Sequence, residues 1–173
     1  QIILDSFNLI KKDFPSVRLV VVPRHPERAN KIKALFLKMG SKSIYESEGD
    51  ISSDILIVKS LGILPTLYAD AQLAFVGGSL VNRGGHNVIE PAIAQCPFIL
   101  GENYFNFKNI VESFISAKAT HIVKTPLDIF EFFCKTYKNQ NDFREGMIRN
   151  ANTVVEKNIG ATMRQLSLIR ASL

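Results

Sequence analysis

Short runs of apolar, largely β-branched residues alternate with longer amphipathic stretches along the whole chain. This alternation is typical of a parallel sheet covered by the helices that connect its strands. The predicted strands are Arg18–Val22, Ser43–Tyr45, Ile55–Val58, Leu73–Val76, Phe98–Leu100 and Ile122–Val123. The predicted helices are Ile2–Phe14, Glu27–Met39, Leu64–Ala69, Glu90–Ala94, Phe107–Ala117, Pro126–Lys138 and residues 144–173, the last with a break at Gly160. The sequence therefore predicts an α/β fold.

The length and composition limit the class of protein. The chain has 173 residues, 46% hydrophobic and 21% charged, which is typical of one globular domain and excludes fibrous and disordered proteins. No apolar run reaches the roughly 18 residues of a membrane-spanning helix, because Lys59, Asp70 and Arg83 interrupt the apolar middle. We expect a single domain over residues 1–173. Its first residue, Gln1 and not Met, suggests a piece of a longer protein.

Charge and cysteine usage narrow the possible partners. The formal net charge of +5 favours anionic partners such as nucleotides, phosphates or anionic lipid. The positive charges are spread along the chain without Lys/Arg clusters, so we expect no nucleic-acid partner. Cys96 and Cys134 match neither a disulfide framework nor the spacing of zinc ligands. We expect buried thiols in a reducing compartment, and neither a metal nor another cofactor.

The residues from Gly77 to Asn87 form the most informative loop. They include four of the ten glycines and connect the predicted strand ending at Val76 with a helix near Glu90. In parallel α/β sheets, ligands bind beyond the carboxyl ends of the strands. Backbone amides at the start of that helix would suit a phosphate, although the glycines could also only shape a long surface loop. The spacing matches neither a Walker loop nor a dinucleotide fingerprint.

Polar residues beside this loop suggest how a nucleotide could be held. Asn87 and Glu90 are three positions apart, so a helical first turn places both on one side, where a carboxylate can accept both hydroxyls of a ribose. Asn-x-x-Glu is also the spacing of a capping box, and Glu90 could itself cap a helix that starts at Pro91. Arg24, which follows the first strand, either binds a phosphate or is simply solvated.

The histidines and acids provide no catalytic set. His25 and His86 lack acidic residues at metal-ligand spacing, so we prefer a loop-ordering role for both, and His121 before a strand is structural. We find no paired carboxylates, nucleophile elbow or Cys-His pattern. The sequence predicts no catalytic residue in this chain.

Several segments together resemble a known family. They are YADAQLAFVGGSLV at residues 68–81, GGHNVIEPA at 84–92, Asn106-Phe107, and VPRHPER at 22–28. These segments resemble the carboxyl-terminal half of 3-deoxy-D-manno-octulosonic acid (Kdo) transferases, which build the inner core of lipopolysaccharide. The resemblance implies a Rossmann-like parallel sheet with helices on both faces, the second half of a glycosyltransferase-B fold. In that family the amino-terminal half binds the lipid A acceptor and carries the catalytic glutamate, and the carboxyl-terminal half binds the CMP part of CMP-Kdo.

The resemblance also implies which residues contact the nucleotide. Pro23 and Arg24 would lie on its phosphate side, and Glu90 on the ribose hydroxyls. Asn87, Val88 and Ile89 would line the ribose and phosphate together with Glu90. The other implied nucleotide-binding residues are Gly84, Gly85 and His86. Leu61, Gly62 and Ile63 correspond to a Met-Gly-Glu segment of the family. Because Ile63 replaces the acid, only contacts made by the backbone of this segment are expected to survive.

The implied function is transfer of Kdo, with inversion, from CMP-Kdo to a lipid A precursor. The resemblance places this reaction at the cytoplasmic face of the bacterial inner membrane, with the full-length enzyme in peripheral contact with the membrane. Because the catalytic glutamate belongs to the other half, we expect the present chain alone to be inactive. Two alternatives stay open, the donor domain of a glycosyltransferase that uses a UDP-sugar and a nucleotide-binding module without catalysis.

Overall fold

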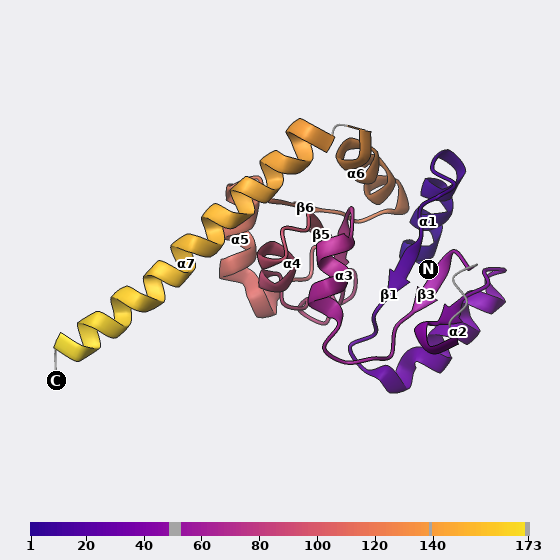
Figure 1. Cartoon of the computed structure of the whole chain (residues 1–173), viewed down its shortest axis with the longest axis horizontal. Coiled ribbons are helices and arrows are strands. Elements are labelled where there is room, and N and C mark those ends of the chain that lie inside the picture. Colours follow the sequence, from indigo (N-terminus) through magenta and orange to yellow (C-terminus); the bar gives the residue numbers. More distant parts are fainter. Residues whose placement is uncertain (49–52, 139, 172–173) are drawn as a thin grey trace. The chain divides into compact units, whose positions relative to one another are not determined.

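The computed structural model describes residues 1–48, 53–138 and 140–171. The chain divides into two compact units, each with its own sheet and core (Figure 1). The first unit comprises Gln1–Leu64 with Thr125–Phe130, and the second comprises Pro65–Lys124 with Glu131–Leu173. The single donor domain expected over residues 1–173 stays a prediction.

The first unit is built on three parallel strands in the order β1-β3-β2. The strands are β1 (Leu19–Val21), β2 (Ile44–Tyr45) and β3 (Ile55–Ile57). The helices are α1 (Ile2–Asp13) and α2 (Ala29–Lys38), and short 3-10 turns at Pro26–Arg28 and Glu46–Glu48 follow β1 and β2. Ile55 and Ile57 of the central strand are buried together with Leu4 and Phe7 of α1 and Phe36 of α2. This packing explains why the central strand is a continuous apolar run.

The second unit also has three parallel strands, but here they follow the order of the chain, β4-β5-β6. The strands are β4 (Ala74–Val76), β5 (Phe98–Leu100) and β6 (Thr120–Ile122). The helices are α3 (Leu64–Asp70), α4 (Ile89–Ile93) and α5 (Lys108–Ser116), and a 3-10 turn covers Phe105–Phe107. All three residues of β5 are buried, and Phe98 packs edge-on against Phe114 of α5 with ring centroids 5.3 Å apart.

The carboxyl-terminal part of the chain is helical. Helix α6 (Pro126–Lys138) is followed by a π-helical turn at Gln140–Arg144 and by α7 (Glu145–Ala171). Ala151 and Val154 of α7 join the core of the second unit. The predicted break at Gly160 is wrong, since α7 continues through it as one long ribbon (Figure 1). A glycine costs only about 1 kcal/mol inside a helix, which the flanking helical residues can absorb.

The fold class predicted from the sequence is confirmed as α/β with parallel strands. The last strand begins two residues earlier than predicted, so His121 lies within β6 and not before it. Its ring stacks on Phe132 with centroids 5.1 Å apart, in agreement with a structural role. The described strands are hydrogen-bonded as two three-stranded sheets and not as one continuous sheet. No helix in the described ranges is both long enough and apolar enough to cross a membrane.

Candidate functional site

Ser79 fixes the start of the glycine-rich loop that follows β4. Its side chain is fully buried, and its hydroxyl donates to the carbonyl of Val76 at 2.6 Å and accepts from the amide of Gly101 at 2.8 Å. The carbonyl of Ser79 accepts further hydrogen bonds from Asn103, at 2.9 Å from its amide and 3.2 Å from its side chain. This one residue therefore links the carboxyl ends of β4 and β5, the edge where ligands of parallel sheets bind.

Asn106 holds the far side of the same loop. Its side-chain nitrogen donates to the carbonyl of Arg83 at 3.1 Å, and its amide donates to the carbonyl of Gly84 at 3.1 Å. A Cβ on Gly84 would lie 2.3 Å from that side-chain nitrogen, and Gly84 has a φ of +80°. Only glycine fits there, because any side chain would collide with Asn106 and strain the backbone.

His86 covers the beginning of the loop. Ring atoms of His86 lie 3.3 Å and 3.2 Å from the positions that a Cβ on Gly77 and on Gly78 would take. The amide of Gly85 donates to the carbonyl of Gly78 at 3.2 Å, so that N–H is already used within the loop. These contacts support the loop-ordering role expected for His86.

Asn87 and Glu90 form a hydrogen-bonded pair at the start of α4. The side-chain oxygen of Asn87 accepts from the amide of Ile89 at 3.0 Å, and its side-chain nitrogen donates to Oε1 of Glu90 at 3.0 Å. Glu90 is exposed and lies in the first turn of a helix that begins at Ile89, so it does not cap a helix starting at Pro91. Within the described chain no backbone amide donates to its carboxylate. Val88 is the N-cap residue, the Asn87 side chain binds the first amide of the helix, and Glu90 is exposed and held by Asn87.

The other predicted residues of this loop have different environments. Val88 is fully buried in the core, so only its backbone is available to a ligand. Helix α4 has only five residues, so its dipole adds less to an anion site than the sequence suggested. The groups of this loop that remain available to bind a ligand are backbone amides and the Glu90 carboxylate.

Five predicted residues lie in the first unit, after its own strands. Pro23 and Arg24 follow β1, and Arg24 is exposed without an ion pair or hydrogen bond to any residue that the structure describes. Beside it, Nδ1 of His25 lies 3.4 Å from Oε1 of Glu27. The remaining residues are Leu61, Gly62 and Ile63, which follow β3. The start of their loop is held by Glu46, whose carboxylate accepts hydrogen bonds from the amides of Lys59 and Ser60. In each unit, the residues expected to bind the nucleotide therefore lie at the carboxyl ends of that unit's own strands.

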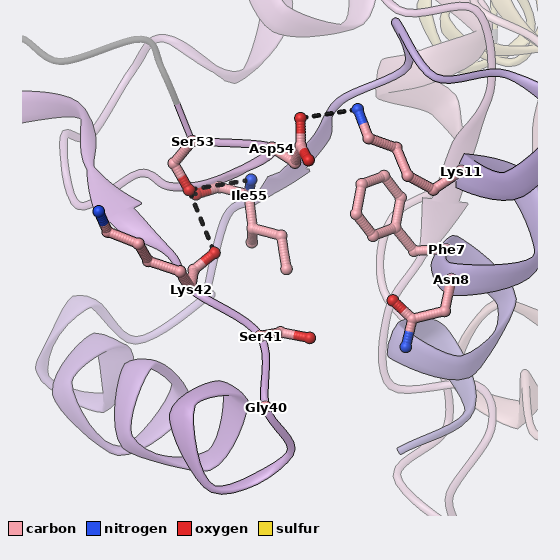
Figure 2. A pocket seen from close by; sticks show the side chains of 9 residues that line it. All are labelled: Phe7, Asn8, Lys11, Gly40, Ser41, Lys42, Ser53, Asp54 and Ile55. Carbon is pink, nitrogen blue, oxygen red and sulfur yellow. Dashed lines mark hydrogen bonds and ion pairs between the residues drawn. The ribbon is translucent and has the colours of Figure 1, made fainter.

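A pocket of about 360 Å³ lies at the opposite end of β3, where the strand begins (Figure 2). Lys11 crosses this end of the strand, with its ammonium 2.6 Å from the carboxylate of Asp54 and 3.1 Å from the carbonyl of Val17. Ser53 donates to the carbonyl of Lys42 at 3.1 Å. None of the predicted site residues lines this pocket, so it does not belong to the candidate site.

Comparison with known proteins places this geometry in a family. No protein-family model matches the chain. Over its full length it is 32% identical to the 3-deoxy-D-manno-octulosonic acid transferase of Haemophilus influenzae, and over 102 residues it is 40% identical to that of Aquifex aeolicus. The crystal structure of the C-terminal CMP-Kdo binding domain of WaaA from Acinetobacter baumannii matches with a TM-score of 0.82 and 30% identity, covering 90% of this chain and 81% of that one. The chain belongs to the Kdo transferase family.

Membership of the Kdo transferase family confirms the resemblance found in the sequence. The chain spans 41% of the Haemophilus influenzae transferase and 28% of the Aquifex aeolicus one. It therefore corresponds to one part of a Kdo transferase, and its fold is that of the carboxyl-terminal domain solved from Acinetobacter baumannii.

Two buried titratable groups of this Kdo transferase family member, Tyr68 and Cys96, have raised pKa values. Burial, followed by the nearby charge of Glu90, raises the pKa of Tyr68 to about 12. Burial raises the pKa of the Cys96 thiol to about 11, although the positive charge of Arg144 lowers it. Cys96 is the buried thiol predicted, whereas Cys134 is only half-buried. At neutral pH both groups are therefore mainly in their uncharged, protonated forms.

Ser79, Gly101, Asn103 and Asn106 were not predicted as site residues. Ser79 and Asn106 lie in the segments that resemble the family, which was the only available signal. Their hydrogen-bond partners are 22 to 24 positions away in the sequence, so their roles depend on the fold. The described residues include no group of three or more His, Cys, Asp or Glu side chains that could hold a metal ion.

Proposed function

We propose that this chain is the donor-nucleotide domain of a Kdo transferase and binds the CMP part of CMP-Kdo. The observation that carries this proposal is the match, over 90% of the chain, to a domain described as CMP-Kdo binding. The full-length enzyme would transfer Kdo to a lipid A precursor at the cytoplasmic face of the bacterial inner membrane. The acceptor and the catalytic glutamate would belong to the amino-terminal part, so this chain alone would bind the donor without transferring Kdo.

The resemblance to the family implies a division of roles between one residue of each unit, Glu90 of the second and Arg24 of the first. The Glu90 carboxylate, held by Asn87 at 3.0 Å and otherwise exposed, accepts the two ribose hydroxyls. The guanidinium of Arg24 binds the phosphate. As the bond to Kdo breaks, negative charge grows on that phosphate, and the positive charge of Arg24 would stabilise it.

Titration of the chain with CMP and with UMP, followed by calorimetry, tests this function. We expect CMP to bind about tenfold more tightly or better, because a site that is complementary to the cytosine amine leaves polar groups unpaired against uracil. Tighter binding of UMP would support a domain for UDP-sugars instead. If neither nucleotide binds, the proposed function is wrong.

Arg24→Ala is expected to weaken CMP binding about tenfold or more and to leave cytidine binding nearly unchanged. The variant loses a charge-assisted hydrogen bond to phosphate, a group that cytidine lacks, and such a bond contributes roughly 1.5–3 kcal/mol. Arg28→Ala is the matched control, since it removes an exposed positive charge four positions further along. Equal losses for CMP and cytidine, or an equal loss in the control, would contradict the role of Arg24.

A further inference from the structure

Glu46 makes the main side-chain contact with the loop that follows β3. It comes directly after β2, at the start of the Glu46–Glu48 turn. Its Oε1 accepts three hydrogen bonds, from the amides of Lys59 and Ser60 at 2.8 Å each and from the hydroxyl of Ser60 at 2.7 Å. One carboxylate oxygen therefore joins the carboxyl ends of β2 and β3.

Glu46 is ionised, as expected for a carboxylate that accepts several hydrogen bonds. Burial by itself would raise the pKa of Glu46, but the hydrogen bonds from Ser60 and Lys59 outweigh it, so its pKa lies below the usual value. Its second oxygen, Oε2, is buried and has no hydrogen-bond partner among the described residues. The carboxylate is thus ionised at neutral pH and accepts three hydrogen bonds from this loop.

A cation-π contact links the same two segments. The ammonium of Lys59 lies 3.8 Å from the ring centroid of Tyr45, the last residue of β2, and that of Lys33 lies 4.2 Å from it. The Tyr45 hydroxyl donates to the side-chain oxygen of Asn30 at 2.7 Å, which fixes the ring. The Lys59 side chain and the Lys59–Ser60 backbone are therefore both held at the end of β2.

Beyond Ser60 the loop has little packing of its own. Leu61 is 82% exposed, and a Cβ on Gly62, whose φ is +84°, would find no atom within 4 Å. Ile63 stands where the family has an acid, so this segment would contact a nucleotide through its backbone. Backbone contacts depend on the orientation of the peptide planes, and Glu46 holds the two peptide groups that directly precede this segment, those of Lys59 and Ser60.

We propose that Glu46 is a positioning residue for nucleotide binding, acting through Lys59 and Ser60 on the backbone of Leu61–Ile63. This inference rests on the proposed function, because it assumes that these three residues contact CMP. Glu46 itself does not touch the ligand. It holds two consecutive amides in place and thereby presents the following peptide groups in one orientation.

The test compares Glu46→Gln with Glu48→Gln. Glu48 belongs to the same turn, pairs with Lys33 at 2.7 Å and acts on Lys59 through its negative charge, but among the described residues it makes no hydrogen bond to Lys59 or Ser60. It is therefore a matched control for the loss of one negative charge. Two quantities are measured at a temperature where all variants are folded by circular dichroism. They are the CMP dissociation constant and the hydrogen-exchange rates of the Lys59 and Ser60 amides.

We expect Glu46→Gln to speed exchange of both amides and to weaken CMP binding about fivefold to tenfold, since the charge of the acceptor is lost. Ser60→Ala, which removes one of the three hydrogen bonds, should have a smaller effect of the same sign. Glu48→Gln should change neither quantity. If Glu46→Gln binds CMP as tightly as the parent chain, the positioning role is wrong and the proposed function stands. If the parent chain does not bind CMP, the proposed function fails and this role fails with it, whereas the exchange rates still report whether Glu46 orders the loop.

Discussion

Gly101→Ala is expected to lower the free energy of unfolding by about 3 kcal/mol or more, at or above the upper end for overpacking a core. A Cβ at this position would lie 2.3 Å from the carbonyl oxygen of Ser79 and 2.7 Å from the amide nitrogen of Leu80. Both are backbone atoms, so no side chain can rotate away. The clash also opposes the 2.8 Å hydrogen bond from Gly101 to the Ser79 hydroxyl. Urea unfolding followed by circular dichroism measures the loss.

Gly146→Ala is the matched control for that experiment. Gly146 lies in helix α7, where a Cβ would have its nearest neighbour, a side-chain nitrogen of Arg149, at 3.9 Å. Alanine is preferred to glycine in a helix by up to about 1 kcal/mol, so this variant should be as stable as the parent or more stable. A Gly101→Ala variant as stable as Gly146→Ala would show that the ends of β4 and β5 do not approach as closely as described.

Glu90→Gln is expected to weaken CMP binding about tenfold or more and to leave the melting temperature nearly unchanged. Glutamine loses the charge-assisted hydrogen bond to a ribose hydroxyl, which contributes about 1.5–3 kcal/mol. Stability should change little because the Glu90 side chain is exposed and the first amide of α4, that of Ile89, is bound by the side chain of Asn87 and not by Glu90. Calorimetric titration and thermal unfolding give the two quantities.

The 2′-deoxy form of CMP serves as the control ligand for Glu90. The parent chain should bind it more weakly than CMP, because one hydroxyl that the carboxylate accepts is missing. Glu90→Gln should discriminate far less between the two ligands. If the variant melts at a lower temperature, yet keeps both CMP affinity and discrimination against the deoxy ligand, Glu90 only stabilises the start of α4 and its ribose role is wrong.

The local elements of this protein could be predicted because their signals are local. The apolar, β-branched runs that became β1, β3, β4 and β5 differ from their amphipathic neighbours within a few residues, and buried parallel strands require such runs. The order of strands and loops in an α/β chain also restricts where a ligand can bind. The sequence alone therefore predicted the fold class, the glycine-rich loop and the family.

The candidate site depended on contacts between distant segments. The sequence left open whether Glu90 joins Asn87 in a capping box or itself caps a helix that starts at Pro91. The helix begins at Ile89, whose amide is bound by Asn87, so Glu90 lies inside the first turn and does not cap a helix at Pro91. The break predicted at Gly160 failed because the helical tendency of the residues on both sides outweighs the cost of one glycine.

The side chains that hold the loops after β3 and β4 could not be predicted from the sequence either. Ser79 bonds to Gly101 across 22 positions, and Glu46 bonds to Ser60 across 14. Such hydrogen bonds exist only once strand order and register bring the carboxyl ends of neighbouring strands together. Propensity and periodicity determined which segments of this chain become strands, helices and glycine loops. Only the tertiary structure decided which buried hydroxyl and which carboxylate hold those loops, because hydrogen bonds depend on distances that sequence spacing does not contain.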